Sequence, residues 1–495
     1  MFCRVVVDLI PYKTTSFFVK MQVLSKVNLL YFLYLCGQVM NLAKALRQNN
    51  TNDPHLLGRG DIKKLLAQYS LPAIIGMVVT SLYHIVDSIF IGHGIGAIAL
   101  SGMAVTFPIM NIIIAFSTLI GVGGATLTSI RLGEKDEENA RSILGHVAVV
   151  NTVNGTLLGV ISLIFLEPIL RLFGASETLL PYASDFLSVY MMGIPIGFVF
   201  IGLNNIMRVT GYPQKAMLSS FLTVAVNIIL APIFIFVLGW GMKGVALATV
   251  LSQLVGLIWV LIHFFNRDSL IHFERKRFKL SSKTVLNMMA IGVSPFLMNL
   301  TSSLVVSIIN FGLMKYGGDL AIGAYGIINR VLFLFGMIVI GLTMGMQPIV
   351  GYNYGAKQIG RSFRALKYTI IVSTLIMTFG LLISQLFPHL IMGMFTSDTE
   401  LLGIAVRGMR ITTILFPVIA VQMVISNFFQ SVGKAKIAIF LSLTRQLIFL
   451  IPFLLLLPRY FGLDGVFMSM PAADLIAFFV TVLTFAYQYK HMRKV

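Results

Sequence analysis

Long apolar stretches separated by short polar segments fill the sequence from about residue 60 to its end. Most of them hold about 20 residues or more, enough for a helix to cross about 30 Å of hydrocarbon. The pattern predicts twelve such helices, at about 64–92, 98–132, 138–166, 178–210, 213–238, 243–266, 285–315, 320–353, 365–394, 401–432, 435–458 and 464–488. The predicted fold class is therefore all-α, a polytopic membrane protein.

The first six predicted helices resemble the last six, with a separation of about 222 residues. Prolines, glycines and polar residues recur in the same order, in the pairs Pro72–Pro295, Asp87–Asn310, Gly102–Gly326, Gly133–Gly355, Asn205–Asn427, Gly211–Gly433 and Gly244–Gly465. An even number of helices in each half gives both halves the same orientation. We expect two pseudo-symmetric six-helix lobes related by an axis along the membrane normal, with the substrate site between them.

This repeat defines the expected domains. Residues 61–267 form an N-lobe of six helices, 268–284 a cytoplasmic linker, and 285–495 a C-lobe of six helices with a basic C-terminal tail. Residues 1–60 have no counterpart in the second half. We expect them to be a poorly ordered tail or to precede the true translation start, at Met21 or Met40; a signal-like or interfacial segment is the alternative.

Composition supports the membrane assignment and adds an orientation. Hydrophobic residues make up 57% of the chain and charged residues 11%, against about 45–50% and 25% in soluble domains. The net charge of +19 comes from lysines and arginines in short loops, with no basic helix or aromatic-basic motif for nucleic acid. Most of these cations lie in alternate loops, which predicts that both termini are cytoplasmic in a bacterial inner membrane.

No enzyme motif occurs in the sequence. A GxxxxGK[ST] loop and an HExxH motif are missing, and no GxSxG stands between a strand and a helix. Both cysteines, Cys3 and Cys36, lie in the N-terminal tail, so no CxxC metal site exists in the core. A duplicated bundle without an energy-coupling domain is most simply a secondary transporter driven by an ion gradient. A receptor or scaffold would leave the duplication unexplained.

Asp87 is the strongest candidate for ion coupling. Of the 18 acidic residues, only Asp87 and Asp474 lie well inside apolar segments, where a carboxylate is costly unless it is paired, protonated or facing a cavity. Thr80, Tyr83 and His84 share its helical face by their spacing. Such a carboxylate can exchange a proton or bind Na⁺. The alternative is a carboxylate that only joins helices.

Asp474 is a second candidate, for coupling or for substrate binding. It follows Pro471, where the helix can kink, and it aligns with Gln253 of the first half. Tyr83, His84 and Asn205 are further candidates for this second role. For each of them a hydrogen bond that only packs helices is the alternative.

Five stretches together resemble the multidrug and toxic compound extrusion (MATE) family, in its DinF-like prokaryotic branch. They are LPAIIGMVVTSLYHIVDSIFIG, GVGGATLTSIRLGEKDEENA, NNIMRVTGYPQKAM, NIILAPIFIFVLGWGMKGVALATVLSQ and QPIVGYNYGAKQ. The resemblance runs from about residue 60 to the C-terminus. It implies twelve helices in two lobes, and export of cationic or amphiphilic compounds in exchange for H⁺ or Na⁺.

The resemblance also implies a set of ion-coupling residues in the N-lobe. The family's Asp on the first helix matches Asp87, its Asn on the fourth matches Asn204, and its Thr on the sixth matches Thr249. Of an Asn-x-x-x-Asp pair on the fifth helix, only Asn227 is matched, because Ala231 stands where the second Asp is expected. One carboxylate then remains, which suits a proton or weakly held Na⁺ better than tightly bound Na⁺.

These observations favour an ion-coupled efflux antiporter that acts as a monomer. Its expected partners are small cationic or amphiphilic substrates and membrane lipids, with no nucleic acid and no cofactor beyond the coupling ion. The alternative is a lipid-linked saccharide flippase of a related bundle fold. A flippase would favour a strongly cationic central cavity, for which the C-lobe offers Arg330, Arg407, Arg410 and Arg445.

Overall fold

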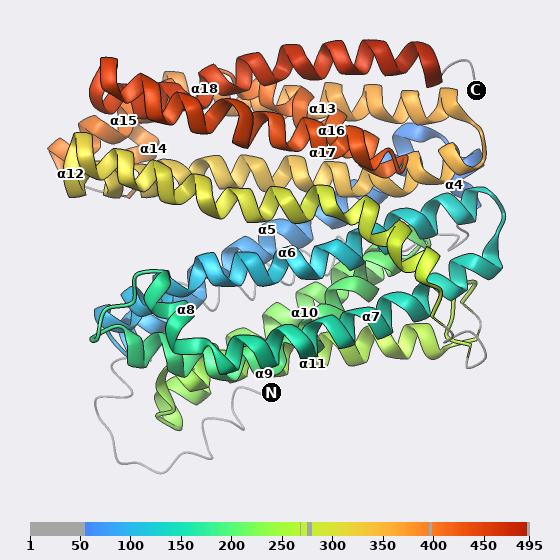
Figure 1. Ribbon diagram of the computed structural model, residues 1–495, viewed down its shortest axis with the longest axis horizontal. Helices are drawn as coiled ribbons and strands as arrows, with labels where there is room; N and C mark the ends of the chain where they lie inside the picture. Colours follow the sequence, from blue (N-terminus) through green and yellow to red (C-terminus); the bar gives the residue numbers. More distant parts are fainter. Residues whose placement is uncertain (1–54, 268, 275–279, 396–397, 493–495) are drawn as a thin grey trace. The chain divides into compact units, whose positions relative to one another are not determined.

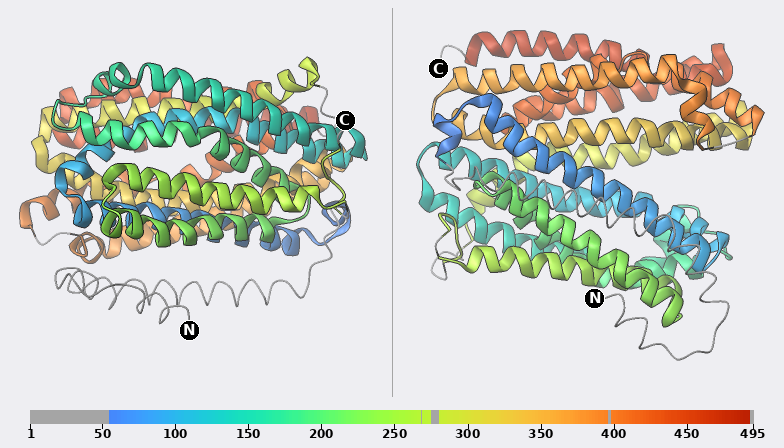
Figure 2. Two further views of the ribbon diagram at one scale, coloured as in Figure 1. Left: turned by 90° about the horizontal axis from the view of Figure 1, so that it is seen from below. Right: turned by 180° about the vertical axis from the view of Figure 1, so that it is seen from behind.

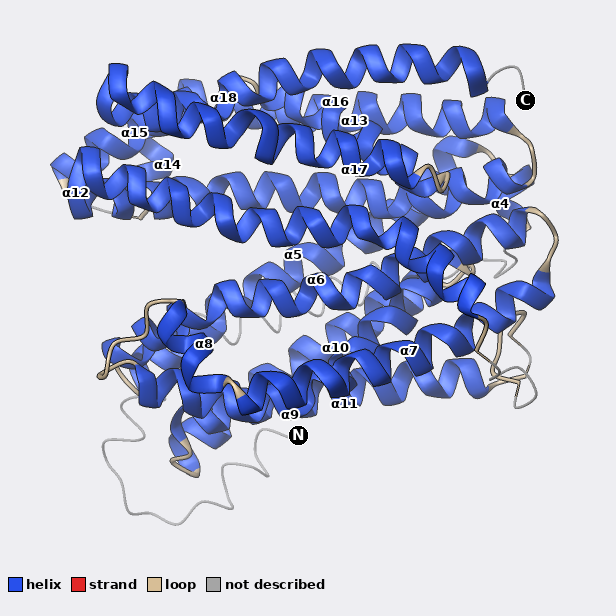
Figure 3. Cartoon of the chain, in the orientation of Figure 1, coloured by secondary structure: helices blue, strands red, loops and turns tan. Residues whose placement is uncertain are grey.

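The computed structural model describes residues 55–267, 269–274, 280–395 and 398–492, apart from the side chains of residues 82–85, 89, 93, 97 and 319. These residues form helices joined by loops and contain no β-strand (Figure 1; Figure 3). The helices are α4 Leu56–Arg59, α5 Ile62–Gly94, α6 Ala97–Gly133, α7 Glu137–Ile164, α8 Leu166–Leu172, α9 Leu180–Val209, α10 Pro213–Pro232, η1 Ile233–Val237, α11 Gly241–Phe265, α12 Ser282–Gly355, α13 Ile359–Leu386, α14 Pro388–Gly393, α15 Thr399–Thr413, α16 Phe416–Ser431, α17 Ala435–Leu443, η3 Thr444–Leu450 and α18 Ile451–Met492.

The described helices provide twelve membrane spans. Ten stretches are long and apolar enough to cross a membrane, and the bent pair α15–α16 makes an eleventh. The stretch Ala435–Met492 contains 58 residues and changes direction at Gly462, whose φ is 57°, so it supplies two spans. The predicted all-α fold of twelve helices in two lobes is confirmed.

Two predicted spans are interrupted at prolines. The span expected at 365–394 ends earlier, because α13 stops at Leu386 and Pro388 starts the short helix α14. The span expected at 401–432 is bent by 51° between α15 and α16, where Pro417 stands in the first turn of α16. Proline restricts the residue before it and lacks the N–H that a continuing helix needs.

The two lobes share backbone details that only a true repeat would preserve. Positive φ values occur in pairs 222 or 223 residues apart, at Gly96 and Gly318, Lys135 and Lys357, Gly211 and Gly433, and Gly239 and Gly462. A non-glycine residue with positive φ is uncommon. The same unusual turn at both lysines therefore shows that the two halves fold alike at the corresponding loop.

The lobes meet along α5, α6 and α12, which approach closely at glycines. A Cβ atom on Gly133 would lie 1.9 Å from the carbonyl oxygen of Tyr352, and one on Gly355 would lie 2.1 Å from that of Ile130. These reciprocal contacts lie at the end of the bundle that carries α4 and the end of α18, here called the α4 end. From behind, the helices of the two lobes diverge toward the opposite end, which carries α8 and α14 (Figure 2).

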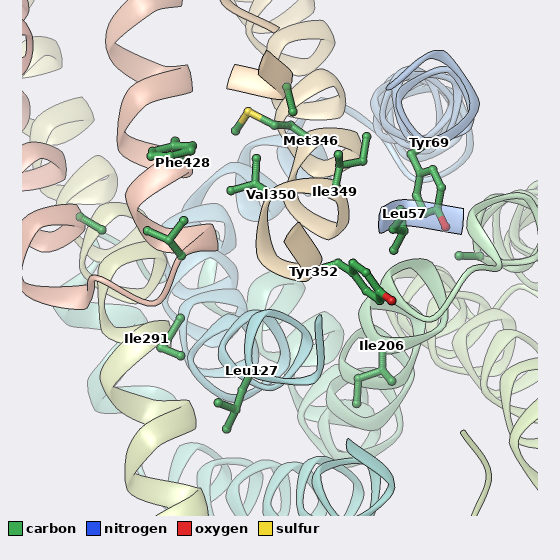
Figure 4. Close-up of a cluster of buried hydrophobic side chains, with 14 of the residues drawn as sticks. Leu57, Tyr69, Leu127, Ile206, Ile291, Met346, Ile349, Val350, Tyr352 and Phe428 are labelled. Atoms are coloured by element: carbon green, nitrogen blue, oxygen red, sulfur yellow. The ribbon is translucent and has the colours of Figure 1, made fainter. Parts of the chain in front are cut away.

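A hydrophobic core spans both lobes near the α4 end (Figure 4). It includes Leu57 of α4, which is 0% exposed. The backbone oxygen of Leu57 accepts hydrogen bonds from Asn353 (2.9 Å) and Arg361 (3.2 Å) of the C-lobe. Arg361 also donates to the backbone oxygen of Gly60 (2.6 Å), so residues 55–60 are anchored by an apolar side chain and two backbone carbonyls. Residues 1–54 of the predicted tail lie outside the described residues.

Candidate functional site

Asp87 lies in the part of α5 far from the α4 end, seven residues before the end of the helix, which is about 10 Å at 1.5 Å per residue. It is 5% exposed. Thr80, on the same face, donates its hydroxyl to the carbonyl of Gly76 in its own helix (2.8 Å). Tyr83 and His84 belong to α5 as well, but their side chains lie outside the described part of the structure. The predicted carboxylate is thus buried in the N-lobe.

Asn227 and Thr249, which the family resemblance places in one site, lie together. The Asn227 amide nitrogen donates to the Thr249 hydroxyl (3.3 Å), which in turn donates to the Val245 carbonyl (3.1 Å). Asn227 is 2% exposed, and its amide oxygen is buried without a hydrogen-bond donor. α10, which carries Asn227, packs against α5, which carries Asp87. An unsatisfied buried acceptor calls for a donor or a cation.

Ala231 follows Asn227 by one helical turn and is fully buried. Residues four apart lie on the same face of a helix. The position where the resemblance expects a second carboxylate therefore faces the protein interior, on the same side of α10 as Asn227. An acidic side chain introduced there would be buried.

Asn204 takes part in a different network. Its amide nitrogen donates to the Ala216 carbonyl (2.9 Å) and the Ser219 hydroxyl (2.6 Å), and its oxygen accepts from Arg208 (3.1 Å). Ser219 precedes Asn227 by eight residues, about 12 Å along α10. Asn204 is therefore not joined to the Asn227–Thr249 pair, although the sequence predicts all three for one site.

Arg208 is a residue whose role the sequence analysis missed. It lies in the last turn of α9 and is 8% exposed. Its guanidinium also donates to the Asn205 oxygen (3.3 Å) and contacts the Met344 sulfur of α12 (3.6 Å). The available signal was the Asn204–Arg208 spacing of four residues. Arg208 thus links Asn205, the N-lobe network and a C-lobe helix.

Asp474 forms an ion pair inside the C-lobe. One of its carboxylate oxygens accepts from the Arg445 guanidinium at 2.5 Å, and the other is buried without a hydrogen-bond partner. Asp474 is 1% exposed. Arg445 lies in the π-helical segment η3, a kind of distortion frequent at functional sites. The sequence analysis named both residues as candidates but did not pair them.

The neighbouring residue Gln446 extends this polar interior. Its amide nitrogen donates to the Ser302 hydroxyl of α12 (3.0 Å), while its oxygen is buried without a donor. The other C-lobe arginines named for the flippase alternative lie elsewhere. Arg330 and Arg410 are exposed, and Arg407 pairs with Asp464.

Comparison with known proteins agrees with this architecture. The MatE family model matches residues 72–233 and 294–456, once in each lobe. The multidrug export protein MepA of Staphylococcus haemolyticus is 28% identical over 421 residues, which is 85% of this chain and 92% of that protein. MepA of Staphylococcus aureus (strain MSSA476) is 27% identical over 421 residues, covering 84% and 92%.

Solved structures resemble the chain over most of its length. One is the outward-facing conformation of a multidrug resistance MATE family transporter of the MOP superfamily, with a TM-score of 0.85 and 25% identity over 90% of this chain and 100% of that one. Another is a MOP superfamily transporter from Pyrococcus furiosus, with the same values.

Twelve spans in two pseudo-symmetric lobes, with a buried carboxylate in one and a buried ion pair in the other, define a multi-pass membrane transporter. The chain belongs to the MatE family, whose model matches more than half of it, and it is a MATE-type multidrug efflux transporter.

Proposed function

We propose that the protein is a secondary active antiporter that exports cationic or amphiphilic compounds in exchange for H⁺ or Na⁺. The observation that carries the proposal is Asp87, buried on α5, which packs against α10, the helix that carries the unsatisfied oxygen of Asn227. A buried carboxylate in a membrane is costly unless it is paired, protonated or facing a cavity, and each of these states can exchange a cation or a proton. Binding and release of that ion therefore change the relative free energies of the conformations of the N-lobe.

Coupling follows from the chemistry of these oxygens. Carboxylate, amide and hydroxyl oxygens are ligands for hard cations such as Na⁺, and a carboxylate also takes a proton. Because Ala231 supplies no second carboxylate, the proposed site holds one negative charge, which suits H⁺ or weakly held Na⁺. Asn204, engaged by Arg208, contributes by holding α9 to α10.

The arrangement of the lobes supports alternating access. Glycine contacts bring the lobes together at the α4 end, and the chain matches a relative described as outward-facing. We assign the α4 end to the cytoplasm of a bacterial inner membrane, because loop cations such as Lys135, Lys357 and Lys434 gather there. With this orientation, the lobes are closed on the cytoplasmic side, and the structure corresponds to the state that releases substrate to the outside.

The antiporter is favoured over the lipid-linked saccharide flippase by the charges of the C-lobe. A pyrophosphate group needs unbalanced cations, whereas Arg445 is balanced by Asp474 and Arg407 by Asp464. The two exposed arginines at 330 and 410 do not form a buried cationic centre.

Asp87→Asn tests the proposal, because it keeps the shape of the side chain but removes the charge and the titratable proton. We expect normal insertion, and gradient-driven efflux of a fluorescent cation reduced at least about tenfold. Each ion gradient is collapsed separately to identify the coupling ion. Asp185→Asn is the matched control. The Asp185 carboxylate is exposed in an ion pair with Lys243, and exposed ion pairs contribute little to stability. Near-wild-type efflux by Asp87→Asn would contradict the proposal.

A further inference from the structure

A basic groove lies at the α4 end, on the C-lobe, where α13 begins beside the last turns of α18. Its volume is about 620 Å³. Three cations, Lys357, Arg364 and Lys367, and two aromatic rings, Phe363 and Tyr489, line it, and no acidic residue of the described ranges does. Among the residues that the structure describes, none of the three cations has an ion-pair partner. The groove therefore presents an unbalanced positive charge.

The helical register of α13 concentrates this charge. Gly360, Phe363, Arg364 and Lys367 follow the spacing i, i+3, i+4 and i+7, which places them on one face of the helix. Gly360 adds no side chain at the top of that face, and nothing lies within 4 Å of where its Cβ would be. Two long cationic side chains can thus reach a single anion beside an open backbone.

Ring contacts hold the aromatic side of the groove, formed by Phe363 and Tyr489, in place. The Phe363 ring stacks on Phe428 (5.6 Å between centroids) and meets Tyr489 edge to face (4.7 Å). The helix Ile359–Leu386 is long and apolar enough to cross a membrane, so its first turns lie at the level where hydrocarbon meets water. Aromatic and basic residues at that level are typical contacts for lipid headgroups.

The repeat provides an internal comparison. Lys135 in the N-lobe adopts the same turn as Lys357, with φ of 61° against 59°. The positions that follow differ in charge: Asp136, Glu137 and Glu138 stand where the C-lobe has Gln358, Ile359 and Gly360, and Ser142 and Gly145 stand where it has Arg364 and Lys367. The fold of this turn thus does not require Arg364 and Lys367, whose equivalent positions in the N-lobe hold no cation.

We propose that this groove binds the phosphodiester headgroup of an anionic glycerophospholipid from the inner leaflet. Arg364 and Lys367 hold the phosphate, Lys357 closes the site from the turn, and the Phe363 and Tyr489 rings cover the glycerol and the first acyl carbons. Basic pockets between membrane helices bind such headgroups through charge-assisted hydrogen bonds. The site is separate from Asp87 and does not depend on the coupling mechanism.

Native mass spectrometry of the purified full chain in detergent measures the proposal directly. Phosphatidylglycerol is titrated against wild type, Arg364→Gln/Lys367→Gln and Lys283→Gln/Lys436→Gln. The last variant removes two exposed cations from the same end but outside the groove. At about fivefold per interfacial charge, the groove variant should bind the first lipid about thirtyfold more weakly. The control should stay within about threefold of wild type.

Two further titrations separate the sources of the anion. Phosphatidylcholine, which carries no net charge, should bind all three proteins alike, and millimolar inorganic phosphate should not displace phosphatidylglycerol. Displacement by phosphate would overturn the lipid assignment in favour of a soluble anion. Equal losses in the groove and control variants would overturn it in favour of general attraction. Should the double variant aggregate, Lys357→Gln, in the turn outside the helices, should lose about fivefold, and unchanged binding would refute the proposal.

Discussion

The crossing of α6 and α12 offers a sharp test of how the lobes close at the α4 end. A Cβ atom on Gly292 would lie 1.7 Å from the Leu119 carbonyl oxygen, and one on Gly123 would lie 1.9 Å from that of Met288. Ordinary contacts begin at 3.4 Å. Because the obstructing atoms are backbone, Gly292→Ala can be accommodated only if the two helices part by about 1.7 Å.

The free-energy cost of Gly292→Ala follows from this displacement. Overpacking a well-packed interface by one methyl group costs about 1–3 kcal/mol. Since α6 belongs to the N-lobe and α12 starts the C-lobe, that strain falls on the conformation in which this crossing is closed. We expect the ratio of closed to open molecules to drop about 5- to 150-fold in Gly292→Ala.

Distance measurements between spin labels report this ratio. Labels are attached at Lys135→Cys in the N-lobe and Lys436→Cys in the C-lobe, after Cys3 and Cys36 are replaced by serine. Gly292→Ala should add a longer distance to the distribution and slow efflux.

Gly336→Ala, in the next span Leu320–Gly355 of α12, is the control, because nothing lies within 4 Å of its Cβ position. A Gly292→Ala protein with the wild-type distance distribution and efflux would refute the reasoning.

Two further predictions concern the buried charges. Ala231→Asp should restore a carboxylate on the Asn227 face of α10, and it should increase the Na⁺ dependence of efflux or shift its pH optimum; unchanged ion dependence in a well-expressed protein would show that this position does not reach the coupling ion. Arg445→Met should leave Asp474 buried and unpaired and lower stability in detergent by about 3–5 kcal/mol, whereas Arg445→Met/Asp474→Leu should recover most of the loss. Equal thermal denaturation midpoints for these two variants would argue against a buried ion pair.

The sequence by itself was sufficient for the architecture. A membrane requires about 20 apolar residues for each span and makes buried charges costly, so hydrophobicity alone marked the helices. The repeat was equally visible, because prolines and glycines stand where the backbone needs them; Gly211 and Gly433, paired in the sequence, both adopt positive φ. The same reasoning marked Asp87 and Asp474, both of which are buried.

Only the tertiary structure decided which polar groups meet. Helical spacing determines the face on which a residue lies, but it does not determine the height at which a neighbouring helix packs. Asn204 and Asn227 both belong to the predicted site, yet Asn204 bonds to Ser219, about two turns of α10 away from the Asn227–Thr249 pair. Arg445 reaches Asp474 from a π-helical turn that no periodicity predicts. Pairings of this kind depend on contacts between helices distant in the chain, and these arise only when the lobes pack.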